Sequence, residues 1–241
     1  MLCFCYKKRV CKCKKRYSGD DSFVRDLTLP PAFVDTVCKQ SVNGPMSEPL
    51  LTLADSLKDR ARAALGSRNL ILVGLMGAGK SSVGRIVASQ LGIPFIDSDH
   101  EIERVSRMTI AELFAAYGED EFRALETRVI KRLLKSGPRV VSTGGGAFVN
   151  ERTRRHIKRG GLSVWLKADL DVLWERVNKR DTRPLLKTEN PKQTLENLMN
   201  ARYPIYAQAD LTVLSRDVRK EIMADEVLTA AIEFQKESPA S

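Results

Sequence analysis

Long apolar segments are absent from this sequence of 241 residues. Its longest nearly apolar run, residues 70–78, is about half as long as the roughly 20 residues that a membrane-spanning helix needs. Cysteine is absent beyond Cys38, and all five cysteines lie within residues 1–45. A secreted domain held by disulfides would distribute its cysteines through its body. We therefore expect a cytoplasmic protein that does not enter the membrane.

Acidic residues are absent from residues 1–16, which hold seven Lys and Arg. Residues 1–45 together hold nine basic and four acidic residues, so half of the net charge of +10 lies there. The other 196 residues carry 31 basic and 26 acidic side chains and are only mildly basic. This distribution argues against a nucleic-acid-binding fold and favours a protein that handles small anions.

The first ten residues have neither the apolar core of a secretory signal nor the serines of a transit peptide. Two Cys-x-Cys units in this region are a weak metal-binding pattern, because zinc modules usually use Cys-x-x-Cys. We expect residues 1–45 to be a disordered or mis-assigned extension without function, with the true start at Met46. After it we expect a leading helix over residues 46–66, a catalytic domain over residues 67–236 and a tail over residues 237–241.

From residue 47 onward, short apolar runs alternate with segments of helical periodicity. Such alternation predicts a parallel sheet with helices on both faces, which is an α/β fold. The polar stretch 178–191 contains two prolines and is predicted to be a mobile loop suited to a lid. The five predicted strands cover residues 69–74, 94–97, 139–143, 162–166 and 211–214.

A phosphate-binding motif follows the first predicted strand directly. Residues 74–81 match G-x-x-x-x-G-K-[ST], in which glycines let backbone N–H groups point at a phosphate. Lys80 would reach the outer phosphates, the Ser81 hydroxyl would bind Mg²⁺, and Ser82 could contact the inner phosphates. The motif predicts binding of a nucleoside triphosphate but does not by itself distinguish a kinase from a GTPase or an ATPase.

Two carboxylates follow the second predicted strand. The carboxyl ends of parallel strands line the ligand crevice, so Asp97 and Asp99 should face the nucleotide or the acceptor. Asp97 could hold Mg²⁺ through water, and Asp99 could accept a hydrogen bond from a substrate hydroxyl and take its proton. The alternative is that one of them only caps a helix that begins near Glu101.

Three arginines and a run of glycines suggest an anionic acceptor. Arg123 either binds a ligand or pairs with Glu119 on the same helix face, whereas Arg202 has no acidic residue at helical spacing. Residues 144–146 are all glycine at a strand end, which suggests close approach of a ligand to backbone, although a plain loop remains possible. Arg183 lies in the predicted lid.

The motifs occur together in one order: G-x-M-G-x-G-K-S-S, D-S-D-H-E-I-E, E-F-R-x-x-E, G-G-G-A, R-P-L-L and R-Y-P-x-Y-x-x-A-D. In this the chain resembles the shikimate kinase family over about residues 68 to 215. The resemblance implies a P-loop NTPase fold of the nucleoside-monophosphate-kinase type, with a five-stranded parallel sheet in the order 2-3-1-4-5. It also implies that ATP phosphorylates the 3-hydroxyl of shikimate, in the pathway to chorismate and the aromatic amino acids.

The resemblance further implies a role for each matching residue. Lys80, Asp99 and Arg183 would be catalytic, and Ser81 and Asp97 would bind Mg²⁺. Arg176 would stack on adenine, with Arg216 as a weaker candidate for a second adenine contact. ATP would be bound by Gly77, Ala78, Gly79, Lys80, Ser81, Ser82, Arg176 and Arg183. Shikimate would be bound by Asp99, Arg123, Gly145, Gly146 and Arg202. The protein would be a monomer, with shikimate and ATP as its ligands.

Two other functions stay open on the residues alone. A gluconate or nucleoside-monophosphate kinase would share this fold, although a pair of arginines suits a carboxylate better than a nucleotide. A non-catalytic nucleotide-binding module, or an RNA-associated protein that uses the basic residues 1–16, would leave the acceptor-site residues without a role.

Overall fold

The computed structural model describes residues 3–4, 12–13, 53–179 and 189–237. The chain divides into two units, Met1–Leu50 and Leu51–Ser241. In the first unit, β1 (Cys3–Phe4) and β2 (Lys12–Cys13) pair as antiparallel strands. Met46 and residues 238–241 lie outside the described residues, so the expected start site and tail stay predictions.

The second unit is built on a five-stranded parallel sheet in the order β4-β5-β3-β6-β7. Numbered along the unit, this is the predicted order 2-3-1-4-5. The central strand is apolar and entirely buried, as expected where helices cover both faces of a parallel sheet. The strands are β3 (Asn69–Val73), β4 (Phe95–Asp97), β5 (Val140–Ser142), β6 (Gly161–Lys167) and β7 (Leu211–Leu214).

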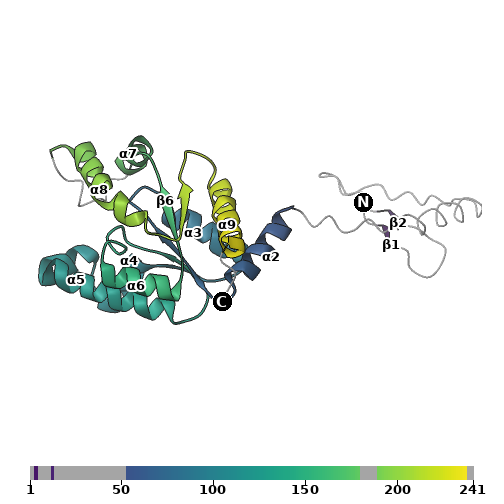
Figure 1. Ribbon diagram of the computed structural model, residues 1–241, viewed down its shortest axis with the longest axis horizontal. Helices are drawn as coiled ribbons and strands as arrows, with labels where there is room; N and C mark the ends of the chain where they lie inside the picture. The colour runs from purple at the N-terminus through teal and green to yellow at the C-terminus, as the bar shows by residue number, and fades with distance from the viewer. Residues whose placement is uncertain (1–2, 5–11, 14–52, 180–188, 238–241) are drawn as a thin grey trace, which may run out of the picture. The chain divides into compact units, whose positions relative to one another are not determined.

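Eight helices of this unit lie within the described residues. The helices form two groups: α2, α3 and α9 pack on one another, and α5 packs on both α4 and α6. The two groups lie on either side of the sheet, and α7 packs on α8 near one end (Figure 1). The helices are α2 (Leu53–Leu65), α3 (Lys80–Leu91), α4 (Ser98–Ser106), α5 (Ile110–Leu134), α6 (Glu151–Gly160), α7 (Leu170–Asn178), α8 (Pro191–Tyr206) and α9 (Lys220–Glu237).

Local sequence signals set the helix ends. The Thr109 side chain accepts from the Glu112 backbone N–H while the Glu112 carboxylate accepts from the Thr109 N–H, so a capping box begins α5. Gly92 ends α3 in the left-handed conformation. Gly118, with φ of 77° and ψ of 179°, kinks α5. No helix of the described residues is long and apolar enough to cross a membrane.

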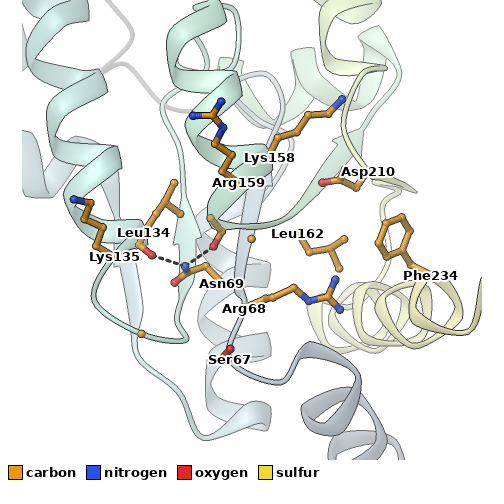
Figure 2. Close-up of a pocket in the computed structure, with 13 residues that line it drawn as sticks. Ser67, Arg68, Asn69, Leu134, Lys135, Lys158, Arg159, Leu162, Asp210 and Phe234 are labelled. Atoms are coloured by element: carbon orange, nitrogen blue, oxygen red, sulfur yellow. Dashed lines mark hydrogen bonds between the residues drawn. The ribbon is translucent and has the colours of Figure 1, made fainter. Parts of the chain in front are cut away.

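The amino edge of the sheet carries a cavity of about 470 Å³ (Figure 2). At its wall, the Asn69 side-chain amide donates to the carbonyl oxygens of Leu134 (2.9 Å) and Gly160 (2.6 Å). One buried amide therefore ties the first residue of β3 to the ends of α5 and α6. None of the residues singled out in the sequence lines this cavity, so the candidate site lies elsewhere.

Candidate active site

The phosphate-binding loop connects β3 to α3, as predicted. Gly77 has a φ of 83°, which a residue with a side chain rarely adopts, and a Cβ there would lie 2.9 Å from a methyl carbon of Val177. The loop curls around the Lys80 ammonium group, which donates to the carbonyl oxygens of Gly74 (2.8 Å) and Leu75 (2.9 Å). The helix N-terminus that follows provides a partial positive charge at the same place.

A hydroxyl and a carboxylate meet beside this loop. Ser81 Oγ donates to Asp97 Oδ2 at 2.7 Å and lies 3.2 Å from Ser142 Oγ at the end of β5. These hard oxygen atoms fit Mg²⁺, which uses few protein ligands together with phosphate and water. The described residues contain no group of three or more His, Cys, Asp and Glu that could hold a metal ion.

Asp97 also caps α4, because its Oδ1 accepts from the backbone N–H of Asp99 at 3.1 Å. The helix begins at Ser98 and therefore earlier than the predicted start near Glu101. Asp97 therefore has both of the roles that the sequence offered as alternatives, because it caps α4 and also contacts the phosphate loop. Burial raises the pKa of Asp99, Asp97 raises it further, and Lys80 opposes the rise.

Arg123 lies on α5 and forms two ion pairs. Its Nη1 donates to Glu126 at 2.8 Å and its Nη2 to Glu119 at 3.2 Å, so the predicted pair with Glu119 forms together with one that was not predicted. The Glu126 side chain is only 1% exposed, and burial raises its pKa while Arg123 opposes the rise. A Cβ on Gly146 would lie 2.6 Å from the Arg123 Cζ, so glycine there leaves room for the guanidinium.

Arg202 reaches the same strand end from α8. A Cβ on Gly145 would lie 3.4 Å from Arg202 Nη1. One turn later the buried Tyr206 hydroxyl donates to the Gly145 carbonyl oxygen, which attaches α8 to the glycine run. Burial raises the pKa of Tyr206 to about 12, and Arg202 opposes the rise. The two arginines therefore approach adjacent glycines from different helices.

Arg176 on α7 contacts the opposite side of the phosphate loop. Its Nη1 donates to Ser215 Oγ at 2.8 Å and to the Gly77 carbonyl oxygen at 3.3 Å, and its Nη2 donates to the Arg216 carbonyl oxygen at 2.5 Å. Ser215 Oγ in turn donates to the Ala78 carbonyl oxygen at 3.0 Å. This places Arg176 between the loop and the segment after β7.

The structure thus gathers the predicted residues at the carboxyl ends of β3, β4 and β5. Arg183 lies outside the described residues. The sequence alone did not identify Ser98, Glu126, Ser142, Ser215 or Tyr206 as site residues. Glu126 had a signal, because it lies three residues after Arg123 on a helix, whereas the others depend on contacts between distant segments.

Comparisons with known proteins agree with this geometry. The family model described as shikimate kinase matches residues 76–232. A shikimate kinase of Rhizobium leguminosarum bv. trifolii is 92% identical over 196 residues, covering 81% of this chain and all of the relative. One from Rhizobium meliloti is 75% identical over 181 residues, covering 75% of this chain and 94% of the relative.

Among solved structures, a shikimate kinase from Acinetobacter baumannii in complex with shikimate is similar with a TM-score of 0.68. The two sequences are 36% identical, and the match covers 75% of this chain and 99% of the other. The chain belongs to the shikimate kinase family.

Proposed function

We propose that the crevice at the carboxyl edge of the sheet transfers the γ-phosphoryl group of ATP to the 3-hydroxyl of shikimate. The observation that carries this assignment is the meeting of Arg123, Arg202 and Asp99 around the glycine run, directly beside the phosphate loop. Two guanidinium groups suit a carboxylate because each can donate two parallel hydrogen bonds, and a nearby carboxylate suits a hydroxyl group. The product, shikimate 3-phosphate, leads to chorismate and the aromatic amino acids.

On the nucleotide side, residues 77–82 cradle the phosphates, and Lys80 neutralises charge on the outer ones. The oxygen atoms of Ser81 and Asp97, which lie within hydrogen-bond distance of each other, would hold Mg²⁺. The cation supplies charge neutralisation when it is bound. Arg176 and, with less support, Arg216 contact adenine, and Arg183 in the lid over 178–191 contacts the phosphates.

On the acceptor side, Arg123 and Arg202 bind the shikimate carboxylate, and Gly145 and Gly146 let it approach the backbone. Asp99 binds the ring hydroxyl. As the hydroxyl oxygen bonds to the γ-phosphorus, the bond between that phosphorus and the ADP oxygen breaks, and Asp99 receives the hydroxyl proton. Burial raises the pKa of Asp99, which makes it a better proton acceptor than an ordinary aspartate. We further propose a cytoplasmic monomer without a nucleic-acid partner.

A coupled assay that follows ADP release tests the proposal. Shikimate should stimulate release in the presence of ATP and Mg²⁺, whereas gluconate and nucleoside monophosphates should not, and the opposite preference would support the related kinases of this fold. Absence of release with every acceptor would contradict a kinase function.

A pair of glycine variants tests the acceptor site in particular. Gly146→Ala should raise the KM for shikimate about tenfold or more, because the new methyl group displaces the Arg123 guanidinium, and it should leave the KM for ATP unchanged. Gly145→Ala is the matched control with more clearance, so its effect should be smaller. Equal effects on both substrates would contradict the assignment of Arg123 to the carboxylate.

A further inference from the structure

We propose that Ser98 is a positioning residue for the Asp99 carboxylate, which it couples to the backbone of the glycine run at Gly144. The inference rests on the role proposed above for Asp99 in binding the acceptor hydroxyl. Ser98 does not touch the substrate in this scheme. It acts through its hydroxyl group, which lies between a carboxylate on α4 and an amide at the end of β5.

The hydrogen bonds of Ser98 determine where its proton points. The side chain is fully buried at the first position of α4. The Gly144 backbone N–H donates to Ser98 Oγ at 3.0 Å, and Ser98 Oγ donates to Asp99 Oδ1 at 3.4 Å. A hydroxyl has a single proton, and a buried one needs an acceptor. Since Gly144 occupies an acceptor position of this oxygen, the proton is left for Asp99.

The same oxygen of the Asp99 carboxylate also packs against the backbone at Gly144. A Cβ on Gly144 would lie 2.6 Å from Asp99 Oδ1 and 3.2 Å from Glu126 Oε1. Asp99 therefore packs directly on the glycine Cα while the Gly144 N–H holds Ser98. Ser98, Asp99 and Gly144 are thus linked by hydrogen bonds and packing, which fixes the Asp99 carboxylate relative to the glycine run. The carboxylate is thereby also fixed relative to the guanidinium groups that meet at this run.

The charged groups around Asp99 are Asp97 beside it, Glu103 on α4, Lys80 on α3 and Glu126 on α5. Asp97 and Glu103 raise the pKa of Asp99, whereas Lys80 and the Ser98 hydroxyl lower it. The hydroxyl favours the ionised form because it donates to the carboxylate. Without the hydroxyl, the carboxylate loses the contact that fixes its position.

The test is steady-state kinetics of the purified full chain carrying Ser98→Ala, with ATP and shikimate varied separately. We expect kcat/KM for shikimate to fall about five- to tenfold, the loss of one hydrogen bond, while the KM for ATP stays unchanged. Ser98→Thr keeps the hydroxyl and should restore most of the activity.

Ser106→Ala is the matched control, because it removes the same group from the other end of α4, where the hydroxyl bonds backbone carbonyl oxygens. It should change neither kcat/KM for shikimate nor the KM for ATP. An unchanged kcat/KM for shikimate in Ser98→Ala, or a parallel rise of the KM for ATP, would overturn the inference. So would failure of Ser98→Thr to restore the activity.

Combination with Asp99→Asn separates this inference from the proposed function. If Asp99→Asn lowers shikimate turnover but Ser98→Ala does not, the role of Ser98 fails and the role of Asp99 stands. If Asp99→Asn leaves turnover unchanged, the proposed role of Asp99 fails, and the inference with it. In the Asp99→Asn background, Ser98→Ala should have little further effect, because the two residues act as one unit.

Discussion

Arg123 is both a predicted ligand of the acceptor and the partner of a buried acid. Its guanidinium lies 2.8 Å from Glu126, whose side chain is 1% exposed. A buried ion pair of this kind adds little net stability to the fold. Removal of one partner leaves a buried charge, which either becomes protonated or destabilises the fold. The same residue therefore links substrate binding to the pH dependence of stability.

We predict that Arg123→Met destabilises the protein more at pH 8 than at pH 5. Burial raises the pKa of Glu126 and Arg123 opposes the rise, so removal of the guanidinium raises this pKa further. A carboxyl group whose pKa is higher in the folded state contributes stability below its unfolded pKa, and that contribution is lost as pH rises through the folded pKa. The deficit relative to wild type, measured by urea unfolding, should be about 2 kcal/mol larger at pH 8.

Arg155→Met removes a comparable but exposed ion pair with Glu151 and serves as the control, with no pH-dependent deficit expected. Addition of Glu126→Gln to Arg123→Met should abolish the difference between the two pH values. Equal deficits at pH 5 and pH 8 in Arg123→Met would show that Glu126 is not the group responsible.

Among the secondary-structure elements, β3 holds the sheet and two helices together at its first residue. Asn69 is 2% exposed and donates both amide hydrogens to the carbonyl oxygens that end α5 and α6. Its own Oδ1 has no partner, so the contribution of this side chain lies in its two donors. This attachment is at the edge of the sheet opposite the phosphate loop.

Loss of these donors should therefore lower stability without affecting catalysis. Asn69→Ala is expected to reduce the free energy of unfolding by about 2 kcal/mol, the value of two hydrogen bonds that leave helix-end carbonyl oxygens unsatisfied. Asn69→Asp has nearly the same shape but places an acceptor against two acceptors, so it should destabilise more. Chemical denaturation measures both, with the exposed Asn200→Ala expected to stay within about 0.5 kcal/mol. An Asp variant as stable as wild type would refute the donor role.

The sequence predicted the elements well where their signals are local. All five strands of the sheet were found, because strands covered on both faces read as short apolar runs. The boundaries were less accurate. The strand predicted over residues 94–97 begins at Phe95, and the one predicted over residues 162–166 extends over Gly161–Lys167.

The candidate site shows the same difference between residues with a local sequence signal and residues without one. The phosphate loop was predicted completely because its residues are consecutive, and the glycine run was singled out because bulky side chains are missing at a strand end. The contact of Tyr206 with Gly145 and that of Ser98 with Gly144 join segments that are 61 and 46 residues apart. No periodicity encodes such pairs, so only the folded chain identifies them.

At the scale of the whole molecule, the described site residues all belong to the unit Leu51–Ser241. This unit includes α2, which precedes the sheet in sequence and packs on α9. Ala61 and Leu65 of α2 are buried, and Arg68 just beyond the helix donates to the Gln235 side chain of α9 at 2.5 Å. The leading helix is therefore part of the folded core.

Two truncated proteins test whether α2 belongs to the folded catalytic unit while residues 1–45 do not. Removal of residues 1–45 should leave kcat, both KM values and the melting temperature unchanged, since neither the site nor α2 is altered. Removal of residues 1–66 should lower stability by about 3 kcal/mol or more, because the α9 face that α2 covers is exposed to water. Thermal denaturation and the coupled assay measure both effects. RNA binding that weakens steeply with salt, and that is lost with residues 1–45, would instead give the basic segment a function of its own.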